Sequence, residues 1–125
     1  MNTRFVPAAL ALSLAAVFAM SAQAEPAAKM VNGRLVNASG MTLYTFDKDV
    51  AGNGKSACNG PCSAVWPPAM AAAGAKPEGD FSLVTRDDGA KQWAYKGRPL
   101  YQYAVDQKAG DATGDNVGNV WHVVK

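Results

Sequence analysis

The chain has 125 residues, including 12 Lys or Arg and 10 Asp or Glu, and a formal net charge of +2 at pH 7. This length suits a single domain. The near-neutral charge and the lack of any run of basic residues argue against nucleic acid as a partner, because binding to phosphates needs a basic surface.

The first 24 residues have the features of a secretory signal peptide. Arg4 supplies a positive start, residues 6–20 are almost all apolar, and Ala22-Gln23-Ala24 matches an A-x-A cleavage site. The apolar run is shorter than the roughly 20 residues of a membrane-spanning helix. The residue directly after the expected cleavage site is Glu25 and not the cysteine that lipid attachment needs. We therefore expect cleavage after Ala24, a periplasmic or secreted protein, and neither a membrane span nor a lipid anchor.

The next segment, residues 25–32, is predicted to be a flexible lead, and residues 33–125 are expected to form one β domain. In that domain, apolar and polar residues alternate over short segments bounded by Gly, Asn, Asp and Ser, which is typical of β-strands. The predicted strands are residues 33–36, 41–46, 81–85, 90–95, 100–105 and 117–124.

Several connections between these strands carry their own signals. Asp88-Gly89 and Lys96-Gly97 are predicted turns. Pro99 cannot donate a ladder hydrogen bond, so it should lie at the start of its strand or on an outer edge. The alanine-rich residues 70–76 could form one or two helical turns, which Gly74 and the following proline would end.

One stretch of the chain occurs twice. Residues 40–49 return as residues 97–106 at a constant offset of 57, and each copy runs through a Gly-rich loop to a tryptophan, Trp66 or Trp121. The pattern predicts two pseudo-symmetric hairpin units, packed as a small antiparallel sandwich or barrel. The units are about residues 33–68 and 89–125, joined by 69–88. The repeated positions are Gly40, Leu43, Tyr44, Phe46 and Asp49 with Gly97, Leu100, Tyr101, Tyr103 and Asp106.

The pattern resembles a family of small secreted bacterial repeats, often lipoproteins, whose function is unknown. The resemblance implies an exported β domain and supplies no catalytic residue. The chain departs from the lipoprotein members because it lacks their lipobox cysteine. The residues that carry the resemblance are Leu43-Tyr44, Phe46, Asp49, Cys58, Cys62, Trp66-Pro67-Pro68, Asp88-Gly89, Gln92-Trp93, Tyr95, Gly97, Pro99-Leu100-Tyr101, Asp106, Gly110-Asp111 and Trp121-His122.

Cys58 and Cys62 are the two cysteines of the chain. A close pair in an exported protein normally forms a disulfide, and the intervening Asn59-Gly60-Pro61 favours a turn that brings the two Cβ atoms together. The same Cys-x3-Cys spacing also suits Cu(I) or thiol redox chemistry. The single histidine, His122, could complete such a site. The residues favour a structural disulfide and leave the metal alternative open.

Other catalytic or metal patterns are weaker. No Gly-x-Ser-x-Gly turn accompanies His122, so a serine hydrolase is not indicated. Residues 47–54 and 106–116 space oxygen ligands faintly like calcium loops. They lack the Asp-x-Asp-x-Asp-Gly core and the distal glutamate, and they fit Asx-turns equally well. We therefore predict no enzyme activity and no cofactor.

The aromatic residues lie on both faces of the predicted strands. If the duplicated Leu-Tyr-x-aromatic strands face each other, their rings pair across a pseudo-two-fold axis and form core. If one face is exposed, its rings form a binding surface. The candidate binding residues are Tyr44, Trp66, Trp93, Tyr95, Tyr101 and Trp121.

These features predict a soluble periplasmic or secreted module that binds an unknown ligand or associates with the cell envelope without catalysis. The alternative is a periplasmic copper or thiol-redox protein that uses Cys58, Cys62 and His122. Neither the ligand nor the partner follows from the residues.

Overall fold

The computed structural model describes residues 28–125, so the predicted signal peptide, residues 1–24, and residues 25–27 of the expected lead lie outside the described residues. Over residues 28–125 the chain forms seven strands, one short α-helix and one 3₁₀ turn. In chain order these are β1 (Lys29–Val31), β2 (Arg34–Val36), β3 (Tyr44–Phe46), α1 (Pro61–Val65), β4 (Phe81–Thr85), β5 (Lys91–Tyr95), β6 (Arg98–Pro99), η1 (Val117–Asn119) and β7 (Trp121–Val123).

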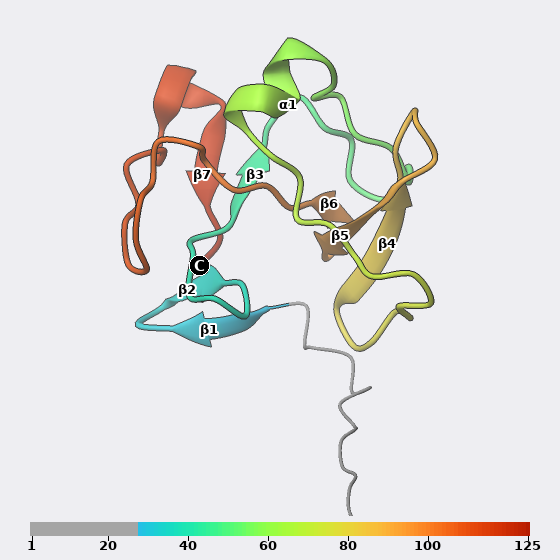
Figure 1. Ribbon diagram of the computed structural model, residues 1–125, viewed down its shortest axis with the longest axis horizontal. Coiled ribbons are helices and arrows are strands. Elements are labelled where there is room, and N and C mark those ends of the chain that lie inside the picture. The colour runs from blue at the N-terminus through green and yellow to red at the C-terminus, as the bar shows by residue number, and fades with distance from the viewer. Residues whose placement is uncertain (1–27) are drawn as a thin grey trace, which may run out of the picture.

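The strands form three small antiparallel sheets, ordered β1-β2, β3-β7 and β4-β5-β6. Figure 1 shows β4 and β5 on one side of the molecule and β3 and β7 on the other, with β1 and β2 below and α1 above. The predicted all-β class is confirmed. The small sheets pack as a sandwich and do not close into a barrel.

The strand β1 lies inside residues 25–32, so the prediction of a flexible lead is wrong for its last part. Asn32 and Gly33 both have positive φ, 53° and 83°. This is the geometry of a two-residue hairpin turn, which Asn-Gly favours. The turn places Val31 opposite Arg34 and so pairs β1 with β2.

Three predicted strands are shorter than expected. In residues 41–46, the strand covers only β3, and Thr42 forms an isolated bridge to Val36. In residues 117–124, the strand covers only β7, because Asn116, Gly118 and Asn119 adopt left-handed conformations that turn the chain before it. In residues 100–105, Tyr101 leaves β5 and forms bridges to Tyr44 and to Pro68 instead. Pro99 is the last residue of β6, which is an edge strand of its sheet, so the outer-edge alternative is the one observed.

The helical turn expected in residues 70–76 is not observed. Gly74 has a φ of 83° and the Ala75 N–H donates to the Ala72 oxygen, which makes a tight turn. The α-helix of the described residues is α1 instead, which begins at Pro61. Proline suits the first helical turn because its fixed φ is already helical and no N–H is needed there.

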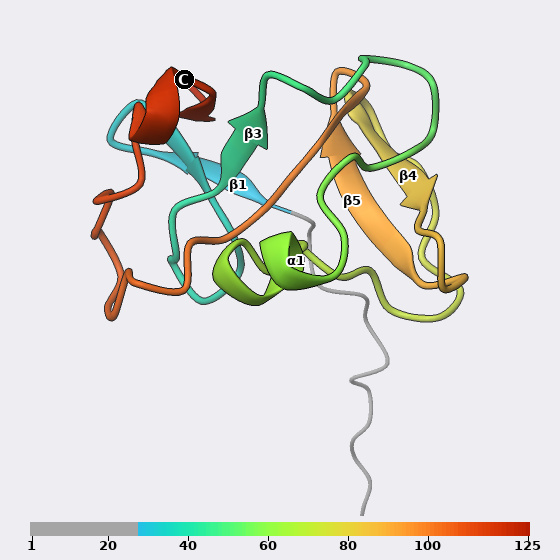
Figure 2. The same cartoon turned by 90° about the horizontal axis from the view of Figure 1, so that it is seen from above.

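The two copies of the repeated motif meet at their tyrosines. The Tyr44 N–H donates to the Tyr101 oxygen at 2.8 Å, and the Tyr101 N–H donates to the Tyr44 oxygen at 2.9 Å. This reciprocal pair marks the pseudo-two-fold axis. Figure 2 shows the orange segment after β5 crossing from the β4–β5 side toward β3, where this pairing occurs.

The end of each copy pairs with the hairpin of the other copy. The Val124 N–H donates to the Leu43 oxygen, and the Ala69 N–H donates to the Leu100 oxygen in the equivalent place. The pairing of β3 with β7 belongs to the same exchange, because β3 lies in the first copy and β7 in the second. Each predicted hairpin unit is therefore completed by the other.

The core forms two clusters. The first, the aromatic cluster, comprises Tyr44, Phe46, Cys58, Trp66, Tyr101 and Trp121, and three of its rings form a four-ring stack with the half-buried Tyr103. Trp66 and Trp121 stack at 3.8 Å between ring centroids, with 4° between their planes. Tyr103 stacks on the outer side of Trp66 and Phe46 on the outer side of Trp121, each at 4.1 Å. Phe46 and Tyr103 are equivalent positions, so the stack follows the pseudo-symmetry. The second cluster comprises Ala28, Leu35, Leu43, Ala69 and Leu100.

Candidate functional site

Two tyrosine–aspartate hydrogen bonds cross between the copies. The Tyr44 hydroxyl donates to Asp106 Oδ2 at 2.6 Å, and the Tyr101 hydroxyl donates to Asp49 Oδ2 at 2.7 Å. Both tyrosines are fully buried. Each Tyr-x-aromatic-x-x-Asp motif therefore satisfies its tyrosine with the aspartate of the other motif, which explains the repeated spacing.

The second carboxylate oxygen of each aspartate holds the loop that follows it. Asp49 Oδ1 accepts the Ala57 N–H at 2.6 Å, and Asp106 Oδ1 accepts the Thr113 N–H at 2.9 Å. The Gly-rich segments weighed as calcium loops are thus folded around carboxylates that accept bonds from their own chain. Asp115 likewise accepts a backbone hydrogen bond, from the Val123 N–H.

Burial sets the protonation of these groups. It raises the pKa of Tyr44, and the bond to Asp106 raises that pKa further. Burial also raises the pKa of Tyr101, although the contact with Ser56 lowers it. Both hydroxyls therefore stay protonated and act as donors. Burial raises the pKa of the Asp49 carboxyl too, against the lowering effect of the Tyr101 bond.

The raised pKa of Asp49 gives a testable pH dependence. Folded Asp49 holds its proton more tightly than an unfolded aspartate, whose pKa is about 3.9. Its contribution to stability is therefore fully present below that value and is lost as the pH rises through the folded pKa. The unfolding free energy of wild type minus that of Asp49→Asn should fall between pH 4 and 7 in urea titrations. A difference that grows over this range would contradict the assignment.

The disulfide predicted between Cys58 and Cys62 is confirmed, with a Cα–Cα distance of 5.2 Å. Cys58 is fully buried in the aromatic cluster, whereas Cys62 lies in α1 and is half-buried. The Trp66 N–H donates to the Cys62 oxygen at the end of that helix. The bridge therefore ties α1, and the tryptophan that follows it, to the core.

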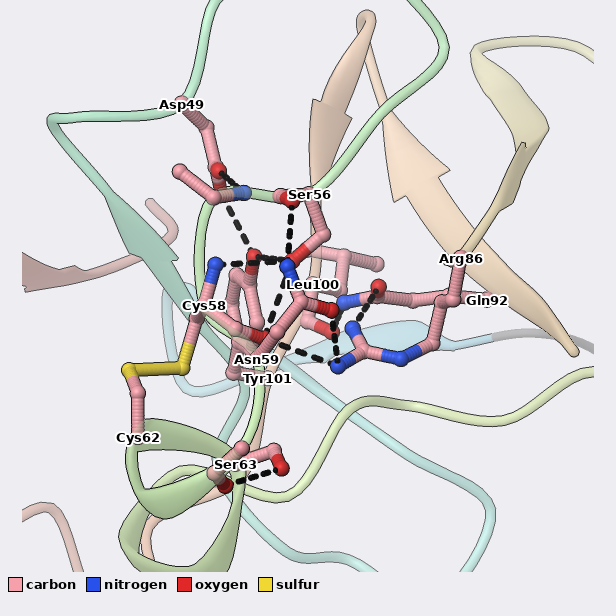
Figure 3. The surroundings of a disulfide bond; sticks show 12 residues. Asp49, Ser56, Cys58, Asn59, Cys62, Ser63, Arg86, Gln92, Leu100 and Tyr101 are labelled. Carbon is pink, nitrogen blue, oxygen red and sulfur yellow. Dashed lines mark hydrogen bonds between the residues drawn. A yellow bond between two sulfur atoms is a disulfide. The ribbon is translucent and has the colours of Figure 1, made fainter. Parts of the chain in front are cut away.

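A buried polar network surrounds the bridge (Figure 3). Arg86 Nη2 donates to the Cys58 oxygen at 2.8 Å and to Asn59 Oδ1 at 3.1 Å. Arg86 Nη1 donates to Gln92 Oε1 at 2.7 Å, and Gln92 Nε2 donates to the Leu100 oxygen at 2.7 Å. The guanidinium is thus bound by neutral acceptors and joins the disulfide loop to β5.

Ser56 links this network to the tyrosine–aspartate pair. Its hydroxyl lies 2.6 Å from the Tyr101 hydroxyl and accepts the Cys58 N–H at 3.1 Å. Buried polar groups are stable when each has a partner. A continuous chain of bonds therefore runs from Asp49 through Tyr101 and Ser56 to the disulfide loop.

Sequence reasoning missed Arg86 and Gln92 as part of this network. From the sequence, Arg86 begins the turn that contains Asp88-Gly89, and Gln92 belongs only to the family pattern. A signal existed in the strand periodicity: Gln92 and Ala94 share one face of β5, and both are fully buried. A glutamine on a buried face implies a polar partner behind the sheet.

Removal of the disulfide is expected to have a mainly local effect. The closed loop is tiny, so a Cys58→Ser/Cys62→Ser variant should fold and lose roughly 2 kcal/mol of stability. Faster hydrogen exchange should be confined to residues 54–68, because the bridge holds α1 there. Reduced wild type serves as the matched control and should show the same pattern. Uniform loss of protection across the domain would contradict a local role.

The alternative metal site is not assembled in the described residues. Cys58 and Cys62 are bonded to each other, and His122 bonds instead to Asp47 at 2.8 Å and to Asn116 at 3.0 Å. Within residues 28–125 no three His, Cys, Asp or Glu side chains group closely enough to hold a metal ion. The structure therefore offers no support for copper binding by these three residues.

The six candidate binding aromatics separate into two groups. Tyr44, Trp66, Tyr101 and Trp121 are buried in the aromatic cluster, so for these four the prediction of an exposed binding surface is wrong. The reciprocal pairing of the two motifs places them in the core. The other two residues, Trp93 and Tyr95, are half-buried and lie on the opposite face of β5 from Gln92 and Ala94.

The comparisons agree with this architecture. The family described as "secreted repeat of unknown function" matches residues 28–70 and, a second time, residues 82–125. No curated protein and no solved structure matches the chain significantly. In the described part of the chain, every helix is too short or too polar to cross a membrane. The chain belongs to this family of secreted repeats and contains the repeat twice, as residues 28–70 (the first repeat) and residues 82–125 (the second repeat).

Proposed function

We propose that the protein is a non-catalytic binding module of the periplasm and that it binds its ligand on an aromatic face of β4 and β5. This aromatic face consists of Phe81, Leu83, Trp93 and Tyr95. The strand register supports it: Phe81 lies opposite Tyr95, and Leu83 lies opposite Trp93. Residues directly opposite each other share one face of a sheet.

The observation that carries the proposal is the partial exposure of all four side chains. Each is half-buried, although the pairing concentrates four large apolar groups in one place. Phe81 lies 5.1 Å from Tyr95 and 6.4 Å from Trp93 between ring centroids. Phe81, Trp93 and Tyr95 pack against the second core cluster, which holds the three rings in place.

The composition of this face suits ligand binding. Tyr and Trp are enriched at binding interfaces, because they bury a large rigid area and keep a polar tip. Lys96 Nζ lies 5.3 Å from the Tyr95 ring and adds one positive charge at the edge. A ligand with an apolar or planar group beside an acidic one fits this set.

By contrast, the groups that could do acid–base or thiol chemistry have structural partners. The hydroxyls of Tyr44 and Tyr101 bond to Asp106 and Asp49, and both thiols are in the disulfide. These bonds support a binding role over a catalytic one.

The test compares native material bound to wild type and to a variant of the face. Protein isolated from the periplasm should carry co-purified molecules identifiable by mass spectrometry, and Trp93→Leu with Tyr95→Leu should lose them. Val65→Ser is the matched control, because Val65 is 45% exposed but lies on α1. Urea unfolding confirms that both variants are folded. Equal recovery from wild type and the face variant would overturn the proposed site.

A further inference from the structure

The contacts between the two repeats come in equivalent pairs. The Asp47 N–H donates to the Val120 oxygen, and the Ala104 N–H donates to the Val65 oxygen. In each bond, the residue after the second aromatic of the motif in one repeat, Phe46 or Tyr103, meets the residue just before the tryptophan of the other. The tyrosine backbone bonds and the tyrosine–aspartate bonds also come in equivalent pairs, and the tryptophan stack joins two equivalent residues.

Neither repeat can satisfy these groups alone. Tyr44 needs the backbone of Tyr101 and the carboxylate of Asp106, and the Trp66 ring needs Trp121. Buried backbone and side-chain polar groups are costly without partners. The surface that completes one repeat is therefore the surface of the other repeat. A second copy of the chain presents that same surface.

Each repeat can be completed by the other repeat of its own chain or by that of a second copy. The connection between the repeats, from Ala71 to Phe81, decides between the two. Gln92 of β5 pairs with Val84 on one side and with Met70 on the other. The first repeat thus ends on one edge of β5, and β4 begins beyond the opposite edge. The two ends are two strand spacings apart, about 10 Å.

The connection must also travel along β5. The Ala71 N–H donates to the Lys91 oxygen at the start of β5, whereas Phe81 lies opposite Tyr95 at its end. Four residues of strand add about 13 Å, so Ala71 and Phe81 are roughly 16 Å apart. Residues 72–74 and 76–80 of this connection are exposed. The connection is long enough to span this distance, and most of it is exposed. The two repeats of one chain therefore meet because the connection is long enough, and not because it packs against them.

We propose that the chain also assembles with a second copy by exchange of repeats. The first repeat of each copy pairs with the second repeat of the other, which gives a closed two-fold dimer. Every contact between repeats is kept, and only the path of residues 72–77 changes. A short flexible connection gives an effective concentration on the order of millimolar. In dilute solution, the two repeats of one chain therefore pair with each other. Pairing between two chains dominates when the connection cannot span the distance between the repeats.

The decisive experiment shortens the connection. Deletion of residues 72–77 leaves four Cα–Cα steps between Ala71 and Phe81, which reach at most about 14 Å. This is less than the roughly 16 Å required, so the deletion variant should be a dimer by light scattering, with twice the mass of wild type and the same near-ultraviolet circular dichroism. The matched control replaces residues 72–77 with six Gly or Ser residues and should remain a monomer. A deletion variant that is a monomer with the native spectrum overturns the proposal.

A second experiment keeps the full connection, in case the deletion prevents folding. One chain carries Trp66→Ala and a first tag, and another carries Trp121→Ala and a second tag. An exchanged pair of these chains contains one undamaged set of repeats, because the intact first repeat of one meets the intact second repeat of the other. Refolded together at millimolar concentration, they should co-purify through both tags and resist more urea than either chain refolded alone. Failure to co-purify overturns the proposal.

Discussion

Trp66→Ala and Trp121→Ala are each expected to lower the free energy of unfolding by about 3–5 kcal/mol. Both side chains are 5% exposed and form the centre of the four-ring stack. Truncation of either ring removes its own burial and leaves a cavity beside its neighbour, which the opposite repeat holds in place. Urea or guanidinium unfolding, followed by circular dichroism, measures the loss.

Trp93→Ala is the control for this prediction. Trp93 is the third tryptophan of the chain and is only half-buried at the edge of the second core cluster. Its truncation should cost clearly less than that of the stacked pair. If Trp66→Ala and Trp121→Ala both cost less than about 1 kcal/mol, far below the usual cost of a core tryptophan, the stack does not stabilise the domain.

Arg86→Met is expected to destabilise the protein by roughly 3 kcal/mol, because it removes the donor to two buried acceptors. Those acceptors are the Cys58 oxygen and Gln92 Oε1. Methionine keeps much of the apolar volume, so the loss reports mainly on hydrogen bonding. Arg98→Met removes the same charge from an exposed position on β6. It should change stability by less than about 0.5 kcal/mol.

The residues whose hydrogen exchange changes in Arg86→Met show whether Arg86 acts through the buried network or only as a surface charge. Loss of Arg86 should speed hydrogen exchange in the disulfide loop and in β5 together, because the guanidinium joins the two. Equal effects of Arg86→Met and Arg98→Met on stability would show that the buried network does not hold the loop.

Much of the fold followed from local patterns in the sequence. Alternation predicted the positions of β2, β4 and β5, and the missing N–H of Pro99 predicted either a strand start or an outer edge, of which the edge is observed. The strand content and the duplication together gave the all-β class. The partners of these strands did not follow, because periodicity reports which face of a strand is buried and not which strand lies beside it. The pairing of β3 with β7 across the repeats could only be seen in three dimensions.

The candidate site was predicted less completely. The disulfide followed from the spacing of Cys58 and Cys62 and from the expected oxidising compartment. The repeated Tyr and Asp were recognised as a motif, but the bond between Tyr44 and Asp106 joins residues 62 positions apart. No local rule links such positions. Composition alone cannot assign exposure to the aromatic residues, so the sequence allows both core and surface for them, and the structure contains both.

Cys58 and Gly114 occupy equivalent places in the two repeats, each one residue after the amide that caps the motif aspartate. A Cβ atom on Gly114 would lie 2.8 Å from the ring tip of Trp66 and 2.9 Å from Tyr103. The second repeat therefore has no room for a cysteine at this position, since the first repeat's tryptophan fills the space. The two repeats are therefore not interchangeable. A copy of the first repeat in place of the second would put a cysteine side chain where the ring of Trp66 lies.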